Sequence, residues 1–427
     1  MNYIEELSNR ELIHSKTPDL EALFSQKQVI AYAGFDPTSD SIHIGNLATL
    51  MLLVRLQRHG HKPIVLIGGA TGMIGDPSGK SHERNLLSEE ILTHNVDSIT
   101  KQLRKFLDFE HPTASAEIVN NYDWMKQFSF LNFLRDVGKQ LTVNYMLAKD
   151  SVQKRLETGL SFTEFSYQLI QAYDFYYLYK HKNCVLQVGG SDQWGNITAG
   201  TELIRRMLGQ SGHGLTCPLL VKSDGSKFGK SESGNIWISP ERTSPYKFYQ
   251  YFLNTADDDL QRIFMVFSLK SIEEINEILA EHPKNPEKRI AQKAIAEELT
   301  SWIHSPEVCK QVIAASLALF SEDLNSLQNI SPSLFEDVFE GVPRSNISME
   351  QFESWTILDI IHQCQIVPSK TEGRKALQAG SIRVNKEKLT DANCLIKQYN
   401  LIHNKFLIIQ KGKKNYYLIE IGLNSCS

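Results

Sequence analysis

Glycines and small polar residues gather where one short apolar run ends and a helical pattern begins. The run Val29–Ala33 is followed by Gly34-Phe35-Asp36-Pro37-Thr38 and then by His43-Ile44-Gly45-Asn46. A loop of this kind at a helix amino terminus lets backbone N–H groups approach an anion. Thr38 and His43 could donate hydrogen bonds to the outer phosphates of a nucleotide. The alternative is a turn-rich loop in which His43 only caps the helix, and this loop alone would favour that alternative.

A second segment, Lys227-Phe228-Gly229-Lys230-Ser231, places two lysines three residues apart on either side of a glycine. By itself, such a run is usually a solvated surface loop. Combined with a phosphate-binding loop earlier in the chain, it indicates a mobile clamp. Its lysines would act as point charges on a transferring or leaving phosphate.

Residues 75–81 (GDPSGKS) superficially resemble a phosphate-binding P-loop. That motif needs four residues between its glycines, whereas three are present here, and Pro77 removes an amide that would contact phosphate. The chain also lacks a GxGxxG dinucleotide fingerprint. Neither class of nucleotide site is predicted.

Polar side chains also share one face of an aromatic helical segment that extends from Phe162 to Lys180. Tyr167, Gln171 and Asp174 follow one another at helical spacing. Because their neighbours are strongly aromatic, this polar stripe could face a partly enclosed pocket. A solvated face is the commoner outcome of such spacing.

These residues need a scaffold, and the first two hundred positions alternate short apolar runs with helical patterns. The runs Val29–Ala33, Ile64–Ile67 and Cys184–Val188 each lead into glycines, and a helix is expected from Asn46 to about Gly60. Strand, helix, strand at this spacing predicts a doubly wound, parallel α/β sheet of Rossmann type, with ligands beyond the carboxyl ends of its strands.

The remainder of the chain predicts two further domains and an uneven charge. The 427 residues carry a net charge of −4, yet positions 366–420 hold eleven basic and four acidic residues, a local charge of +7 on a body of −11. A basic tail of this kind suggests nucleic-acid binding. We therefore divide the chain into a catalytic domain (1–240), a helical domain (241–330), a linker (331–353) and a small α+β, basic RNA-binding domain (354–427).

Within the tail, Ser369 and Glu372 fit a capping box that opens a short helix, which Gly380 would close. Residues 406–410 and 416–421 predict a β-hairpin.

Cysteine usage and the amino terminus bear on the compartment. The six cysteines form no CxxC pair and no cysteine–histidine cluster at zinc spacing, so we predict reduced thiols and no metal-ligating residues. The amino terminus has no apolar signal region, and the longest apolar stretch, Ile64–Ala70, is far too short for a membrane span. A cytoplasmic protein is expected.

Five segments taken in order carry a resemblance to a known family. They are residues 32–46 (YAGFDPTSDSIHIGN), 68–80 (GGATGMIGDPSGK), 162–175 (FTEFSYQLIQAYDF), 187–196 (QVGGSDQWGN) and 227–231 (KFGKS). Together they resemble the bacterial-type tyrosyl-tRNA synthetases, which are class I aminoacyl-tRNA synthetases. Residues 43–46 are similar to the HIGH-type motif and residues 227–231 to the KMSKS-type motif, with Asn46 in place of the final histidine.

The resemblance implies roles for individual residues. Tyrosine would be bound by Tyr32, Asp36, Asp76, Tyr167, Gln171, Asp174 and Gln193, with Tyr32 and Asp174 at the phenol. Contacts to ATP would come from Gly34, His43, Asn46, Asp192, Lys227 and Lys230. Catalytic contacts on the pyrophosphate side would come from Thr38, His43, Asn46, Lys80, Arg84, Lys227, Lys230 and Ser231. The tail would bind tRNA through Lys370, Arg374, Lys375, Arg383, Lys386, Lys388, Lys411, Lys413 and Lys414.

The implied reaction is the activation of L-tyrosine with ATP, followed by transfer of the tyrosyl group to the terminal adenosine of tRNA(Tyr). Mg²⁺ would arrive with ATP, because the sequence offers no dedicated metal cage. The family also implies a homodimer through the catalytic domain, near residues 123–148. Two alternatives remain open at this point: a tryptophan-activating class I synthetase, and a non-catalytic RNA-binding descendant.

Overall fold

The computed structural model describes residues 1–78, 87–156, 159–231, 234–321, 323–412 and 415–422. The chain divides into two compact units. The first comprises Met1–Thr243 and Tyr251–Leu299, and the second comprises Ser244–Gln250 and Thr300–Ser427. Throughout the described ranges, no helix is long and apolar enough to cross a membrane.

A six-stranded sheet forms the centre of the first unit. In spatial order its strands are β1 (Ser15–Lys16), β6 (His213–Cys217), β5 (Leu186–Gly190), β2 (Ile30–Phe35), β3 (Lys62–Ile67) and β4 (Glu117–Asn120). All neighbours are parallel except β1, which pairs antiparallel with β6 at one edge. The predicted Rossmann-like sheet is confirmed, with the short strand β1 as an addition that no apolar run reveals.

The strand order reverses between β2 and β5. From β2 the chain proceeds outward to β3 and β4, whereas from β5 it proceeds the other way to β6. Crossovers in opposite directions place their helices on opposite faces, so a crevice opens at the carboxyl ends of the two central strands. Both central strands end here in residues with predicted roles.

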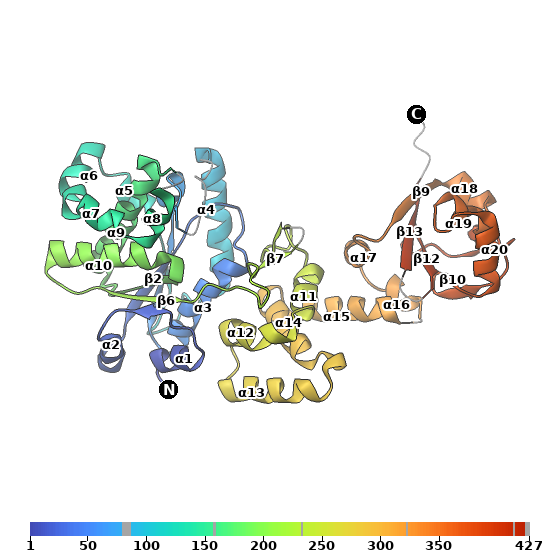
Figure 1. Ribbon diagram of the computed structural model, residues 1–427, viewed down its shortest axis with the longest axis horizontal. Coiled ribbons are helices and arrows are strands. Elements are labelled where there is room, and N and C mark those ends of the chain that lie inside the picture. Colours follow the sequence, from blue (N-terminus) through green and yellow to red (C-terminus); the bar gives the residue numbers. More distant parts are fainter. Residues whose placement is uncertain (79–86, 157–158, 232–233, 322, 413–414, 423–427) are drawn as a thin grey trace. The chain divides into compact units, whose positions relative to one another are not determined.

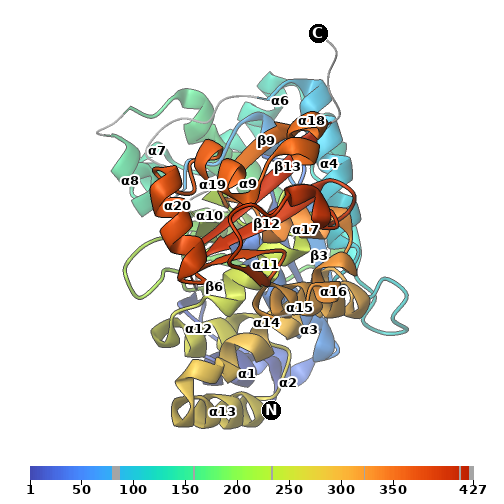
Figure 2. The same ribbon diagram turned by 90° about the vertical axis from the view of Figure 1, so that its right-hand side faces the viewer.

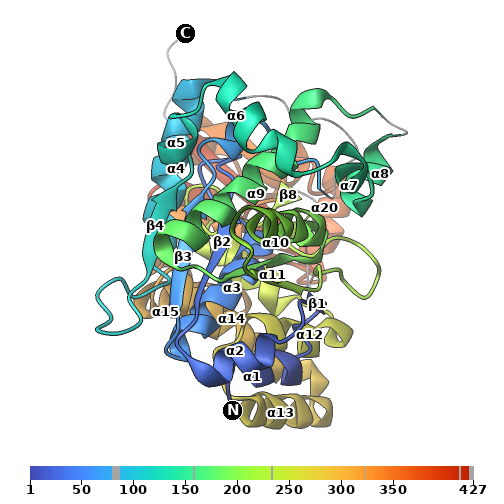
Figure 3. The same ribbon diagram turned by 90° about the vertical axis from the view of Figure 1, so that its left-hand side faces the viewer.

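Helices cover both faces of this sheet. Figure 1 shows α3 (Ile44–Arg58) on one side and α9 (Phe162–Lys182) with α10 (Trp194–Leu208) on the other, and the view in Figure 3 shows α9 and α10 in front of the strands. The other helices before residue 244 are α1 (Tyr3–Asn9), α2 (Leu20–Gln26), α4 (Glu89–Leu103), α5 (Tyr122–Met125), α6 (Phe130–Asp136), α7 (Val143–Leu147) and α8 (Asp150–Leu156).

Local chemistry sets the ends of the helices beside the crevice. At the start of α9, the Ser161 side chain accepts a hydrogen bond from the Glu164 N–H, and the helix ends at Asn183 in the left-handed conformation. Helix α3 ends at Arg58, two residues before Gly60, whose φ of +80° suits glycine. The predicted stop at Gly60 is confirmed.

The expected helical region after residue 244 is also present. Its helices are α11 (Pro245–Leu253), α12 (Asp257–Phe267), α13 (Ile272–Glu281), α14 (Ile290–Ile303) and α15 (Pro306–Phe320). The carboxyl end of α12 is held by two buried arginines. Arg55 donates to the carbonyls of Met265 (3.2 Å) and Ser268 (2.9 Å), and Arg10 donates to the carbonyl of Lys270 (2.6 Å).

The second unit contains a five-stranded sheet. Its strands in order are β11 (Glu387–Leu389), β10 (Ile382–Val384), β12 (Phe406–Lys411), β13 (Asn415–Gly422) and β9 (Arg344–Ser348). The helices beyond α15 are α16 (Asn325–Gln328), α17 (Pro332–Val338), α18 (Met349–Ser354), α19 (Ile357–Gln363) and α20 (Lys370–Gln378). Figure 2 shows α19 and α20 beside β12. The predicted hairpin is confirmed as β12 and β13, and Ser369 caps α20 through the Glu372 N–H as expected.

The stretch 331–353, expected as a linker, has regular structure instead. Strand β9 pairs parallel with β13, with Ile347 opposite Ile421, and α17 contributes the fully buried Phe335, which stacks on Phe406. The strand is polar in sequence because it is the last strand of the sheet, where only Ile347 is buried. An edge strand with one inward side chain lacks the apolar run by which strands are predicted.

Candidate active site

The amino terminus of α3 is held by a reciprocal cap between two predicted site residues. The Asn46 N–H donates to His43 Nδ1 (3.3 Å), and the Asn46 side-chain oxygen accepts from the His43 N–H (3.2 Å). Because Nδ1 accepts, the ring proton of a neutral His43 resides on Nε2. His43 therefore caps the helix, as the alternative interpretation held. The same hydrogen bond orients its Nε2–H as a donor. The Asn46 side chain closes this capping box.

The KFGKS segment lies against this same helix end. The Ile44 N–H donates to the Ile236 carbonyl (3.0 Å), and the Ile236 N–H donates to the Gly229 carbonyl (2.8 Å). Gly229 has φ +83°, and a Cβ added there would lie 3.5 Å from the Ile44 Cβ. Two segments separated by about 180 residues in sequence therefore meet at the amino terminus of α3.

The lysines of this segment extend into solvent. Lys227 and Lys230 are both exposed, and Lys230 begins the short strand β7 (Lys230–Ser231), which pairs with β8 (Gly234–Asn235). Thr38 is exposed as well, in the loop after β2. The arrangement brings the segment that carries these lysines to a helix amino terminus, a place that favours an anion.

Tyr32 on β2 and Asp174 on α9 form a buried pair, and each is only 1% exposed. The Tyr32 hydroxyl has no hydrogen-bond partner within the described part of the chain. Burial and the neighbouring Asp174 carboxylate raise the pKa of Tyr32 well above its ordinary value. A buried hydroxyl left unpaired is costly, so a ligand with a matching polar group would be bound favourably at this point.

Two residues that sequence reasoning missed fix the Asp174 carboxylate. Trp124 Nε1 donates to Oδ1 (2.8 Å), and Asn121 Nδ2 donates to Oδ2 (2.9 Å). Burial raises the pKa of Asp174 to about 7, although both of these hydrogen bonds favour the charged form. Asn121 directly follows β4, at the same sheet edge as the other site residues, and that position after a strand is the signal that could have found it.

A second polar network links Asp36 to this pair. Tyr167 donates through its hydroxyl to Asp36 Oδ2 (2.8 Å), and Thr71 Oγ1 donates to Asp36 Oδ1 (2.7 Å). The Asn121 side chain donates in turn to Thr71 Oγ1 (3.1 Å). A Cβ at Gly68 would overlap the Asp36 carboxylate, so this position requires glycine. The polar stripe on α9 thus faces the interior, and the interpretation as a solvated face is wrong.

A third network surrounds Asp76. Gln193 Nε2 donates to its Oδ2 (2.7 Å), and the Ser78 N–H donates to its Oδ1 (2.9 Å). Burial raises the pKa of Asp76, and those two hydrogen bonds oppose the increase. Gln171 donates to the Gln193 side-chain oxygen at 3.4 Å, and Asn196 donates to the Gln171 oxygen at 3.0 Å. Five residues from three distant segments thus form one polar wall.

The remaining predicted ATP contacts lie on the two central strands. Gly34, near the end of β2, is exposed, and a Cβ there would meet only Leu66, at 3.8 Å. Asp192 lies just after β5 in the single turn Ser191–Gln193, next to Gly190, where a Cβ would be 2.6 Å from the Asp192 carboxylate. Both positions let a ligand approach the backbone.

Several predicted residues cannot be placed. Lys80, Arg84, Lys413 and Lys414 lie outside the described residues, and of Ser231 only the backbone is described. Their roles remain predictions.

The basic residues of the tail differ in how they are engaged. Lys370 pairs with Asp359 (2.7 Å), Lys375 approaches Glu372 (3.7 Å), and Lys411 donates to the Ile366 carbonyl (2.9 Å). Arg374 and Lys388 are exposed, and Arg383 is half-buried.

Lys386 is engaged most fully. Its ammonium group donates to the carbonyls of Ala318 (2.5 Å) in the last turn of α15 and of Ser321 (2.6 Å) and Asp323 (3.3 Å) just beyond it. Burial lowers the pKa of Lys386. Such a cation stabilises the carboxyl end of a helix.

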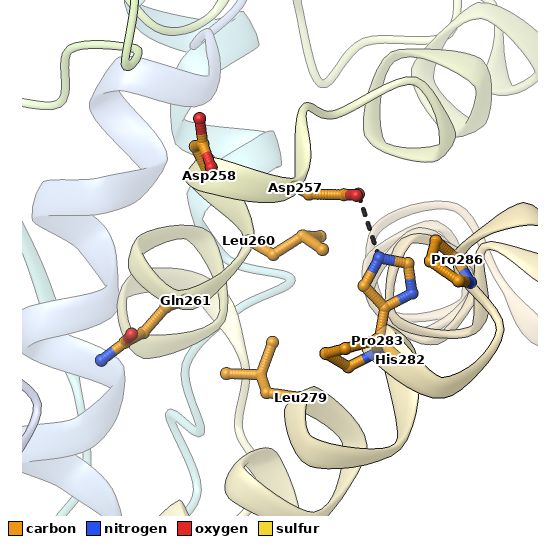
Figure 4. A pocket seen from close by; sticks show the side chains of 8 residues that line it. All are labelled: Asp257, Asp258, Leu260, Gln261, Leu279, His282, Pro283 and Pro286. Carbon is orange, nitrogen blue, oxygen red and sulfur yellow. Dashed lines mark hydrogen bonds and ion pairs between the residues drawn. The ribbon is translucent and has the colours of Figure 1, made fainter.

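A hollow of about 310 Å³ lies elsewhere, between α12 and α13 (Figure 4). His282 Nε2 is 3.0 Å from Asp257 Oδ1 on its wall, and Leu260 and Leu279 supply apolar lining. Its lining includes none of the predicted site residues.

Comparison with known proteins places this geometry in context. Residues 25–321 match the family described as tRNA synthetases class I (W and Y), and residues 335–419 match the Tyrosine–tRNA ligase SYY-like C-terminal domain. The chain is 52% identical over 427 residues to a tyrosine–tRNA ligase of Bacteroides fragilis, covering 98% of this chain and 99% of that one. It is also 52% identical over 426 residues to the enzyme of Cytophaga hutchinsonii, covering 99% and 100%.

Among solved structures, the chain is similar to a C-terminally truncated mitochondrial tyrosyl-tRNA synthetase of Aspergillus nidulans. The TM-score is 0.67 at 32% identity, covering 75% of this chain and 94% of that one. A tryptophanyl-tRNA synthetase of Plasmodium falciparum shares the fold, with a TM-score of 0.51 at 14% identity over 78% and 88% of the two chains.

Proposed function

Because this chain belongs to the tyrosine–tRNA ligases of the class I tRNA synthetases, we propose that its buried pair Tyr32 and Asp174 selects the substrate phenol. The chain is an aminoacyl-tRNA synthetase that activates L-tyrosine with ATP and transfers the tyrosyl group to tRNA. Its full-length relatives are tyrosine enzymes, so the tryptophan-activating and non-catalytic alternatives are set aside. The proposals below concern which residues perform each task.

The unpaired Tyr32 hydroxyl is the observation that carries the phenol assignment. A substrate hydroxyl between Tyr32 and Asp174 would accept from Tyr32 and donate to the carboxylate. Phenylalanine would leave both groups buried and unsatisfied, a rule of selectivity for which tyrosine activation is itself the familiar example. Trp124 and Asn121 hold the carboxylate in place, and each of its oxygens keeps a further lone pair for a substrate hydroxyl.

The amino acid's charged end would lie among the second and third networks. Asp36 and Asp76 are the carboxylates beside Tyr167, Gln171 and Gln193. An ammonium group needs acceptors, and these carboxylates and amide oxygens supply them. We propose that this wall binds the α-ammonium group and leaves the substrate carboxylate directed toward ATP.

In the first step the tyrosine carboxylate attacks the ATP α-phosphate in line, forming tyrosyl-adenylate and releasing pyrophosphate. No protein nucleophile is needed, so catalysis consists of positioning and of stabilising developing phosphate charge. Thr38, His43, Lys227 and Lys230 would act on the pyrophosphate side, and Gly34 and Asp192 on the ribose side. Lys80, Arg84 and Ser231 are proposed for the same task by resemblance.

We propose that Mg²⁺ enters with ATP as part of the substrate. The carboxylates of the site already accept hydrogen bonds: Asp36 from Tyr167 and Thr71, and Asp76 from Gln193 and Ser78. A small cation that keeps most of its waters can be held by the phosphates with few protein ligands.

We also propose a homodimer through the catalytic domain and tRNA(Tyr) binding by the basic tail, in the cytoplasm. Large apolar side chains are exposed in the stretch 123–148, on α6 and α7, namely Phe130, Leu131, Leu134 and Val143. Contiguous exposed apolar surface is typical of a protein interface. In the tail, Arg374 and Lys388 are exposed side chains that could contact phosphates.

The direct test is ATP–pyrophosphate exchange with purified full-length chain. Exchange should depend on tyrosine, and tryptophan at the same concentration should not support it. Exchange with tryptophan alone would contradict the assignment. Reversing the charge of Arg374 should weaken charging of tRNA while leaving exchange unchanged, and loss of exchange in that variant would contradict the division of tasks.

A further inference from the structure

An aromatic socket holds the KFGKS segment from behind. The Phe228 ring lies 5.5 Å from the ring of Tyr251, 6.4 Å from that of Phe252 and 5.7 Å from that of Phe267, and it is stacked on the last of these. Phe252 and Phe267 are fully buried. Aromatic pairs at these distances add to the free energy of burial, so Phe228 fastens the segment to α11 and α12.

The hydroxyl of Tyr251 makes a specific contact in the same place. It accepts a hydrogen bond from the Gly229 N–H at 2.8 Å. Gly229 lies between Phe228 and Lys230 in the sequence. Burial raises the pKa of Tyr251 to about 12, so the hydroxyl stays neutral. Gly229 is also the residue that packs on the first turn of α3. One hydroxyl thus fixes the backbone beside Lys230.

The wall behind the socket is itself anchored. Asp259 on α12 accepts from the Ser223 N–H (2.8 Å), and Arg262 donates to the Val221 carbonyl (2.7 Å). Both partners lie in the turn-containing stretch that leads into the segment. At its carboxyl end, α12 is held by Arg10 and Arg55. The segment that contains Gly229 is therefore held by a helix that is itself anchored to the core.

We propose that Tyr251 and Phe228 are positioning residues that set where Lys230 stands relative to the amino terminus of α3 during adenylate formation. The proposal rests on the proposed function, in which Lys230 stabilises the leaving pyrophosphate. Neither residue touches substrate in this account. They act through the backbone of Gly229.

The test is single-turnover adenylate formation with full-length Tyr251→Phe, which removes only the hydroxyl. The rate should fall roughly fivefold, the factor for one neutral hydrogen bond, while the equilibrium affinity for tyrosine stays the same. Tyr179→Phe is the matched control, because Tyr179 packs on the sheet core rather than on this segment. An unchanged rate in Tyr251→Phe would overturn the proposal.

A double-mutant comparison separates positioning from general destabilisation. In a Lys230→Ala background, Tyr251→Phe should slow the reaction by less than about twofold, because there is no longer an ammonium group to position. A full fivefold loss in that background would contradict the proposal. Phe228→Ala should slow the reaction more than Phe228→Leu, which refills part of the socket, and equal losses would count against the socket.

The activity of the wild-type chain separates failure of the proposed function from failure of the inference about Tyr251. If it fails to catalyse tyrosine-dependent exchange, the proposed function is contradicted and the inference with it. If it is active and Tyr251→Phe behaves as wild type, the inference alone is contradicted.

Discussion

The two ends of the crevice solve different problems with different kinds of residue. At the proposed phenol end, Tyr32 and Asp174 are buried, and Trp124 and Asn121 fix the Asp174 carboxylate. At the proposed phosphate end, Lys227 and Lys230 are exposed on a segment that an aromatic socket holds. Buried polar groups cost free energy unless the right ligand satisfies them, which suits selection. Exposed lysines on a fixed backbone keep long side chains that can reach developing phosphate charge, which suits catalysis.

The largest effect should come from the phosphate end. Lys230→Ala should slow single-turnover adenylate formation by about 10²–10³-fold, the range for losing one group that stabilises transition-state charge. The affinity for tyrosine should change little, because the phenol end is untouched. An unchanged rate would remove Lys230 from the mechanism, and a large loss of tyrosine affinity would break the separation of the two ends.

The next effect should come from Asp174→Asn. An asparagine cannot offer oxygens to both Trp124 and Asn121 and still accept from the substrate, so kcat/KM for tyrosine should fall by about 10²-fold. The KM for ATP should stay near its wild-type value. Steady-state exchange measures both constants, with Asp391→Asn in the exposed tail as the control. A mainly ATP-dependent defect would contradict the account.

Tyr32→Phe should have a smaller effect. It removes a single neutral hydrogen bond, so tyrosine should bind about fivefold more weakly, while phenylalanine should bind no worse. The preference for tyrosine over phenylalanine should therefore fall by the same factor. Equilibrium dialysis of both amino acids measures this, and an equal loss for the two would indicate a packing defect instead.

A separate effect, on stability rather than on activity, concerns pH. Burial raises the pKa of Asp174 from 3.8 to about 7, so the folded chain keeps a proton that the unfolded chain releases between about pH 4 and 7. The wild type should therefore lose stability relative to Asp174→Asn as pH rises through this window, with no further difference above it. Thermal unfolding of the wild type and Asp174→Asn at pH 5 and 8 tests this. An equal change in melting temperature for the two proteins would contradict the raised pKa.

Some of the proposed site residues could be singled out from local sequence patterns, for a physical reason. His43 and Gly229 lie beside or within loops, and Asn46 lies in the first turn of α3, where glycines and polar residues stand out against apolar strands. Strands β2, β3 and β5 were predictable because burial on both faces produces continuous apolar runs.

The partners of the phenol pair were not predictable in this way. Asn121 and Trp124 follow β4, whose four residues are only half-buried and give no clear apolar run. The strand β9 was hidden by its edge position. The Tyr251 socket depends on contacts between segments more than twenty residues apart, which no local spacing encodes. These residues are brought together only by tertiary contacts.

The most direct test of the central claim compares Tyr32→Phe and Lys230→Ala side by side in the full-length chain. For each, equilibrium tyrosine binding and the single-turnover rate of adenylate formation at saturating tyrosine are measured. The account predicts that Tyr32→Phe weakens binding about fivefold with a nearly unchanged saturated rate, and that Lys230→Ala does the reverse, with a rate loss of about 10²–10³-fold. Equal changes in both constants for both variants would contradict the claim that selection and catalysis lie at opposite ends of the crevice.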